Sequence, residues 1–148
     1  MLARLSLRFV LILFLTGAAT IALVTMFEAM IRASLSFGTA LVVVLPLLVA
    51  ARSCGAAWVA HNQSPAGARP ALRYGAWFAL VGLMAYAVFG AAQRLSLGID
   101  PSETARMLAG RPLTAGIIAV LAYATFALIT CTGFALGARA QGRLLPQR

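Results

Sequence analysis

Apolar residues gather in four stretches of this chain, separated by shorter and more polar connections. The stretches cover residues 9–27, 35–51, 74–92 and 113–137. A helix rises about 1.5 Å per residue and the hydrocarbon layer of a bilayer is roughly 30 Å thick, so each stretch is long enough, or nearly so, to cross it. The pattern predicts an all-α membrane protein, a single domain over residues 1–148 with four transmembrane helices in a compact bundle.

Local signals refine this plan at three places. Pro46 lies inside the second stretch, where it cannot donate a hydrogen bond to the carbonyl of Val42, so the helix is expected to bend. The connection from His61 to Arg73 is polar and contains prolines, which predicts an irregular turn. Asp100-Pro101-Ser102-Glu103 carries the signals of a helix start and predicts a short interfacial helix near 101–109, with the two acids as caps.

Composition and charge agree with the membrane class and add an orientation. The chain is 62% apolar and 10% charged. All twelve basic residues are arginines, and eight of them lie at one side of the predicted bundle, which by the positive-inside rule faces the cytoplasm together with both termini. These eight are Arg4, Arg8, Arg52, Arg69, Arg73, Arg139, Arg143 and Arg148. Because the arginines form no basic stripe with interleaved aromatic residues, nucleic acid is not an expected partner.

Small residues recur at helical spacing in the third and fourth stretches, and such residues allow helices to approach closely in lipid. They lie on one face of the third stretch and form a GxxxG pair in the fourth: Gly75, Ala79, Gly82 and Gly90, then Gly133 and Gly137. Two interpretations stay open. The faces close the bundle internally, which is favoured, or they form an interface with another membrane protein or a second copy.

Glu28 is the only acidic residue attached to a predicted span, at the outer end of the first. Intramembrane carboxylates are often proton or cation sites, which makes Glu28 a candidate functional residue. The simpler interpretation is a surface ion pair with Arg32, one helical turn later. The threonines within the spans need no ligand, since a threonine hydroxyl can bond a carbonyl of its own helix.

Catalytic and cofactor sites find no support in the residues present. His61 is the only histidine, so a bis-histidine haem is excluded, and no sulfur or carboxylate cluster accompanies it at metal-ligand spacing. Cys54 and Cys131 form no C-x-x-C motif. No nucleophile is paired with a positioned base. We therefore expect no cofactor and no metal, and a protein that is not an enzyme.

The span layout resembles a group of uncharacterised bacterial inner-membrane proteins of similar length, the ABZJ family. The resemblance covers the whole chain and is carried by an arginine-flanked first span that ends in Phe27-Glu28 and by a second span that contains Pro46. It implies a multi-pass protein of the bacterial inner membrane and brings no activity or site residues.

Two functions remain as hypotheses. The first and preferred one is a non-enzymatic structural or accessory component that interacts with other membrane proteins in the bilayer. The second is a small oligomeric transporter or channel subunit, with Glu28, the bend at Pro46 and the threonines lining a path.

Overall fold

The computed structural model describes residues 1–31, 38–64, 66–98, 102, 106 and 109–144. In this part of the chain the structure is helical, with α1 at Leu2–Ile31, α2 at Gly38–Asn62, α3 at Ala68–Ser96 and α5 at Pro112–Gly142. Each of these four helices is long and apolar enough to cross a membrane. The fold class predicted from the apolar pattern, an all-helical bundle with four candidate spans, is confirmed.

The helices extend beyond the apolar stretches that predict them. The largest difference is in α2, which continues past residue 51 to Asn62, because the residues that follow Arg52 contain no proline and can continue the helix. The predicted irregular turn from His61 to Arg73 is therefore wrong at both ends. His61 belongs to α2, and α3 already begins at Ala68.

Pro70 had suggested a loop, but it occupies the first turn of α3. The amides of a helix's first turn have no partner within the helix, so a proline at this place removes no hydrogen bond. α2 likewise continues through Pro46. The predicted interfacial helix near 101–109 lies mostly outside the described residues and stays a prediction.

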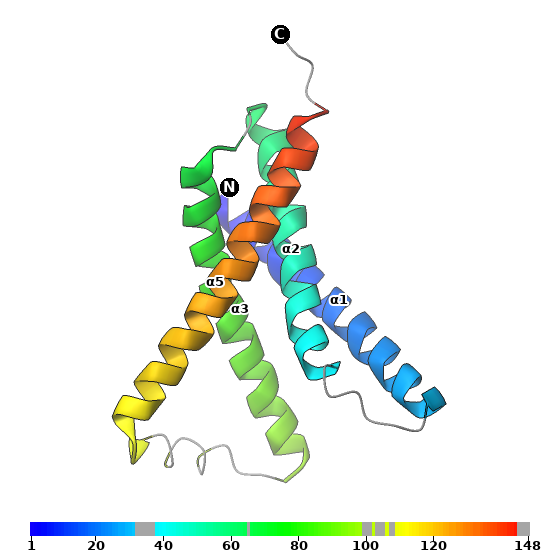
Figure 1. Ribbon diagram of the computed structural model, residues 1–148, viewed down its shortest axis with the longest axis vertical. Helices are drawn as coiled ribbons and strands as arrows, with labels where there is room; N and C mark the ends of the chain where they lie inside the picture. The colour runs from blue at the N-terminus through cyan, green and yellow to red at the C-terminus, as the bar shows by residue number, and fades with distance from the viewer. Residues whose placement is uncertain (32–37, 65, 99–101, 103–105, 107–108, 145–148) are drawn as a thin grey trace.

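The helices run up and down in turn, which brings both ends of the described chain to one end of the bundle (Figure 1). We call this end the basic end, because it holds the start of α1, the end of α2, the start of α3 and the end of α5 with their arginines. α2 and α5 share the most extensive contact, followed by α1 with α2 and α3 with α5. α2 is therefore held between α1 and α5.

The core lies in the half of the bundle nearest the basic end and is built from aromatic rings of different helices. Phe9 of α1 stacks on Phe78 of α3 with ring centroids 4.8 Å apart, and Tyr74 stacks on Phe134 of α5 at 5.6 Å. Trp58 of α2 meets Phe134 edge-on at 6.4 Å. Such ring pairs stabilise a contact by roughly 0.5–1.5 kcal/mol beyond the burial of area, so they join all four helices at one level.

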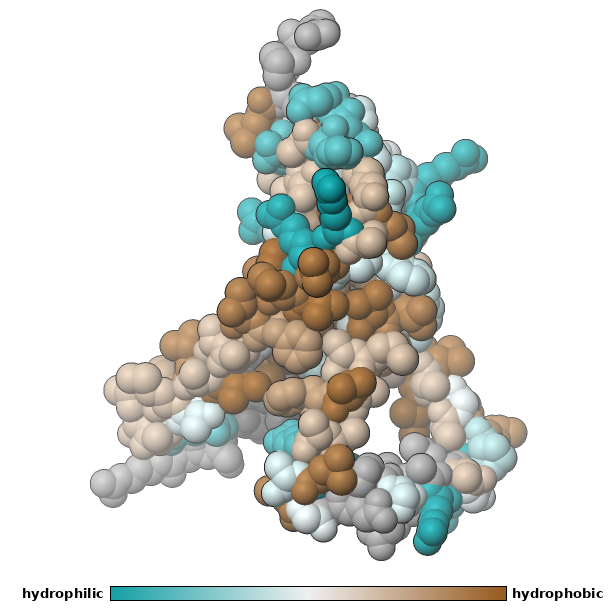
Figure 2. All heavy atoms as spheres, turned by 180° about the vertical axis from the view of Figure 1, so that it is seen from behind, coloured by the Kyte–Doolittle hydropathy of each residue, from teal (hydrophilic) through white to brown (hydrophobic). Residues whose placement is uncertain are grey.

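Toward the opposite end the helices diverge, and they bury little of their length (Figure 1). The last buried residue of α1 is Thr20 and that of α3 is Gly82. Within α5, the residues from Pro112 to Ile129 include none that is buried. Figure 2 shows the result on one face, where apolar side chains cover the middle of the molecule and hydrophilic side chains gather at the basic end.

Candidate interaction surface

The divergence of the helices leaves an apolar groove between α1 and α3, with α2 beside it. Its cavity measures about 150 Å³, a volume that accepts a group of the size of benzene. We call it the apolar groove, and its lining is Leu13, Phe14, Gly17, Ala18, Ile21, Val42, Ala85, Tyr86 and Phe89. Because nearly all of this lining is hydrocarbon, the groove can hold an apolar side chain but offers no polar ligand a place.

Tyr86 gives the groove its one polar group, and that group already has partners. The Tyr86 hydroxyl lies 3.2 Å from the carbonyl oxygen of Val42 and 3.3 Å from that of Val43. Pro46 has no amide hydrogen, so it leaves the Val42 carbonyl without its usual helical partner. Tyr86 of α3 therefore supplies the hydrogen bond that α2 lacks at Pro46. Both the Tyr86 hydroxyl and the Val42 carbonyl thus have a hydrogen-bond partner in the groove wall.

Three glycines in the diverging half have open space beside them. A Cβ added at Gly17, Gly90 or Gly116 would meet nothing within 4 Å in the described part of the chain. Gly17 lines the apolar groove itself. Since helices approach most closely at residues without bulky side chains, these positions can receive another helix.

Other predicted packing residues lie at contacts between the helices of this chain. A Cβ at Gly137 would fall on the Arg52 carbonyl oxygen, and one at Gly133 would lie 2.8 Å from that of Leu48. Both glycines thus let α5 touch the backbone of α2. Gly75 and Gly82 of α3 lie against Cys131 and Leu47, and Ala79 is buried. Gly90 makes no such contact within the described residues, so its role in packing stays a prediction.

Five threonines of the spans, Thr16, Thr20, Thr25, Thr125 and Thr130, bond to backbone carbonyls as expected. Thr16, Thr20 and Thr25 each donate to the residue four positions earlier in α1, at 2.6–2.8 Å. Thr125 does the same in α5. Thr130 also reaches across to α3, where its hydroxyl lies 2.7 Å from the Gly75 carbonyl oxygen. These hydroxyls are engaged with the backbone and do not line a polar path.

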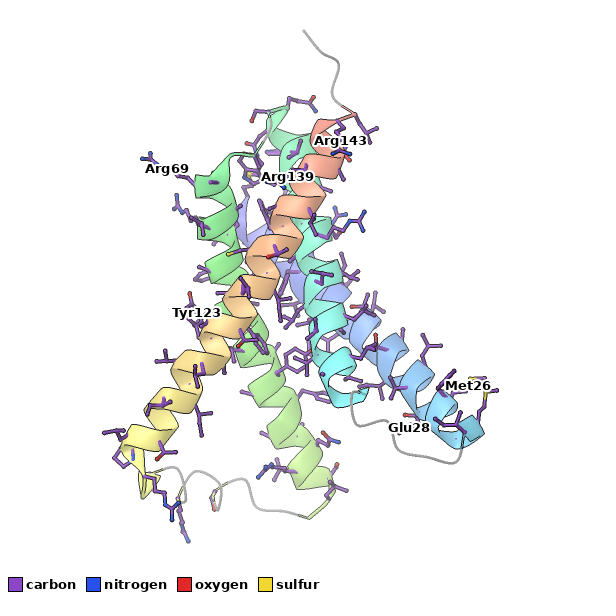
Figure 3. All side chains as sticks on the ribbon, in the orientation of Figure 1. Met26, Glu28, Arg69, Tyr123, Arg139 and Arg143 are labelled. Atoms are coloured by element: carbon purple, nitrogen blue, oxygen red, sulfur yellow. The ribbon has the colours of Figure 1, made fainter. Side chains whose placement is uncertain are left out.

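Glu28 lies near the end of α1 that is opposite the basic end and is partly buried. In Figure 3 its side chain and that of Met26 project to different sides of this helix end, with Glu28 on the side of α2. The predicted partner, Arg32, lies outside the described residues, so the ion pair stays a prediction. Glu28 is not among the residues that line the apolar groove.

Of the eight arginines predicted to lie on one side of the bundle, those that the structure describes lie at the basic end. Arg69, Arg139 and Arg143 are labelled in Figure 3. Arg4 and Arg8 belong to the start of α1, and Arg52 and Arg73 to α2 and α3. Arg148 lies outside the described residues. The Nε of Arg8 donates to the Ser53 hydroxyl oxygen at 3.1 Å, which links α1 to α2 at this end.

The remaining candidates for chemistry lie apart from the groove. Cys54 is buried, and its thiol lies 3.5 Å from the Leu5 carbonyl oxygen, while Cys131 packs beside Gly75; both are free thiols. His61 is exposed near the end of α2. Among the described residues, no three histidine, cysteine or acidic residues lie together as a metal site.

Sequence reasoning found the packing faces but missed what they contact. It did not find the hydrogen bond from Tyr86 of α3 to α2. It also missed the aromatic core and the apolar groove. A missing donor at Pro46 and a tyrosine at similar depth in another span were the available signal, because an orphaned carbonyl in lipid requires a donor.

Comparison with known proteins adds no relative: no family model, no curated protein and no solved structure matches this chain.

Proposed function

We propose that this protein is a non-enzymatic accessory component of a membrane assembly, and that the diverging half of its bundle receives a helix of another membrane protein. The observation that carries the proposal is the apolar groove, which combines an open glycine, Gly17, with aromatic walls from Phe14 and Phe89. A small residue between large ones is the surface into which a neighbouring helix can insert a side chain.

The chemistry of the groove supports a protein helix over a polar substrate. Its one polar atom, the Tyr86 hydroxyl, is already within hydrogen-bonding distance of α2, and the threonines donate to carbonyls. A transport path needs groups that replace the hydration of its cargo. The alternative, a transporter or channel subunit, therefore finds no such groups in this groove, and Glu28 does not line it.

The proposed location is the bacterial inner membrane, with both termini in the cytoplasm. Support comes from the arginines, of which eight of twelve belong to the side of the chain that holds its two ends. All three acidic residues, Glu28, Asp100 and Glu103, belong to the other side. On this proposal the diverging half of the bundle lies in the outer leaflet, and the partner helix is docked there.

The test is to fill the groove without disturbing the fold. A tagged Gly17→Leu chain, expressed at natural level in its host and extracted in mild detergent, is expected to lose a stoichiometric membrane-protein partner that the parent chain retains. The added side chain meets no atom of its own bundle within 4 Å of the Cβ position, so the chain should still fold. Native mass and the co-purifying proteins are the readouts.

Two matched variants sharpen this test. Gly142→Leu adds the same side chain to an equally open position at the basic end and should keep the partner. Glu28→Gln should also keep it, whereas the transporter alternative requires that this variant abolish ion-coupled flux. A parent chain that purifies as a homogeneous homo-oligomer without any partner overturns the accessory function.

A further inference from the structure

A second groove, at the basic end between α2 and α5, has a different chemistry from the first. Its cavity measures about 420 Å³ and is open to the surface. Its lining includes Arg52 and Ser53 of α2 and Gln141 of α5, with Val49 on the side of the membrane. We call it the basic groove. Its floor is the crossing at which Gly137 touches the Arg52 carbonyl, so the helix backbones come close and the side chains stand on either side.

The polar side chains of this groove have hydrogen-bond donors that are not used within the described part of the chain. Within the described residues, the Arg52 guanidinium has no hydrogen-bond or ion-pair partner. Ser53 accepts from Arg8 Nε at 3.1 Å, and a hydroxyl that accepts still carries a proton to donate. The same contact brings a second guanidinium, that of Arg8, next to the groove. Arg52, Ser53 and the Gln141 amide can therefore all donate to one anion.

Among the described residues, no acidic side chain lies beside these donors. Glu28 belongs to the end of α1 that is opposite the basic end. Asp100 and Glu103 come between α3 and α5 in the sequence and lie outside the described residues. The guanidinium pairs well with phosphate because its planar N–H groups can donate two parallel hydrogen bonds. Among the described residues, the Arg52 guanidinium therefore has no anionic partner.

The position of Arg52 indicates that this anion is attached to hydrocarbon. Arg52 directly follows the second apolar stretch, and Val49, Leu45 and Leu41 precede it at spacings of three and four residues. That spacing places the three side chains on the same face of α2, and each of them is exposed. The Arg52 guanidinium thus lies at one end of a row of exposed apolar side chains on α2, and this row extends into the apolar stretch.

We propose that the basic groove binds the phosphate headgroup of an anionic phospholipid, with one acyl chain lying along the Val49, Leu45 and Leu41 face of α2. Basic pockets between transmembrane helices are suited to such headgroups. Arg52 holds the phosphate, with the Ser53 hydroxyl and the Gln141 amide as further donors. The site does not depend on which leaflet the basic end occupies, nor on the partner helix proposed for the apolar groove.

The experiment counts lipids bound to the purified full chain by native mass spectrometry. Phosphatidylglycerol and phosphatidylcholine with identical acyl chains are titrated separately into the detergent. The parent chain should retain one phosphatidylglycerol more tightly than phosphatidylcholine. Arg52→Gln should weaken phosphatidylglycerol retention about fivefold, the effect expected for one basic residue at a membrane surface. Arg69→Gln, which removes the same charge from α3 at the basic end, is the matched control and should retain it.

Each outcome decides the proposal. Arg52→Lys should restore part of the retention, which separates a charge effect from a folding defect, and the thermal unfolding of all variants is compared. Equal losses in Arg52→Gln and Arg69→Gln would show that only the net charge matters and would overturn a defined site. Glycerol phosphate, which carries the headgroup chemistry without acyl chains, should not displace the lipid at equal concentration; if it does, the groove binds soluble anions and the lipid assignment is wrong.

Discussion

The Tyr86 hydroxyl replaces, from another helix, the hydrogen bond that Pro46 cannot donate. In water a bare carbonyl would be hydrated, but in hydrocarbon it costs several kcal/mol, so a donor within reach decides whether a proline is tolerated in a span. The 3.2 Å distance between Tyr86 Oη and the Val42 carbonyl oxygen places that donor. One residue thereby couples α2 to α3, two helices that otherwise touch little.

Removing this hydroxyl should cost more stability while the proline is present than after it is replaced. Tyr86→Phe is expected to lower the free energy of unfolding by about 0.6 kcal/mol, a typical value for hydrogen bonds between membrane helices. In a Pro46→Ala chain the alanine amide can bond Val42 itself, so the same change should cost less. A double-mutant cycle on reconstituted protein measures the difference. Equal costs in both backgrounds would show that Tyr86 does not compensate for Pro46.

Among the elements, α2 and α5 form the tightest pair, and glycines on both helices make it possible. A Cβ at Gly55 of α2 would fall on the Phe134 carbonyl oxygen, just as one at Gly137 of α5 would fall on that of Arg52. The absence of side chains on both surfaces lets backbone meet backbone. Since lipid gives no hydrophobic drive for helix association, this close approach is what stabilises the pair.

A single methyl group at this crossing should therefore be costly. Gly137→Ala must push α5 away from α2 and is expected to destabilise the bundle by about 1–3 kcal/mol, the usual range for overpacking. Gly142→Ala, on the same helix but with open space, should be neutral or stabilising by up to roughly 1 kcal/mol because alanine favours the helix. The free energy of unfolding in mixed micelles is measured for both variants. Similar values would contradict a close backbone contact between α2 and α5 at Gly137.

As a whole, the molecule is closed at one end and open at the other. The aromatic core joins the helices near the basic end, while α5 buries no residue from Pro112 to Ile129, in the diverging half. The two grooves follow this division, one apolar and within the diverging half, the other lined by Arg52 at the basic end. The proposed partner helix and the proposed lipid thus occupy different levels of the bilayer.

The proposed orientation of the whole molecule is tested by cysteine labelling. In a chain with Cys54 and Cys131 replaced by alanine, a membrane-impermeant maleimide should label Glu28→Cys in spheroplasts and Gln63→Cys only in inverted vesicles. The reason is the excess of arginines on the side of Gln63. The parent with both cysteines replaced is the blank. The reverse pattern would overturn the orientation, and labelling of both sites from one side would overturn the four-span topology.

How far the sequence predicts this structure depends on the range of each interaction. Span number follows from local hydropathy, and the apolar stretches lie within the observed helices except for residues 35–37 of the second, which are outside the described residues. The prediction for the middle connection was wrong because a proline usually indicates a loop. Pro70 instead lies in the first turn of α3, which begins at Ala68, where a proline is tolerated. The pairing of Tyr86 with Val42 and the two grooves depend on helix rotation and crossing, which a linear pattern does not specify. Residue type thus predicted which positions can lie at helix contacts, whereas the rotation and crossing of the helices determine which residues they contact.

The crossing of α2 and α5 also has a consequence for how the protein is made. α5 follows the other helices along the chain, so it is the last of the four to leave the ribosome. The α1–α2 hairpin can associate early, yet the backbone surface around Gly55 stays without its partner until α5 has been inserted. The bundle can therefore close only after α5 has been made and inserted, and a chain that ends before α5 leaves the backbone surface around Gly55 uncovered.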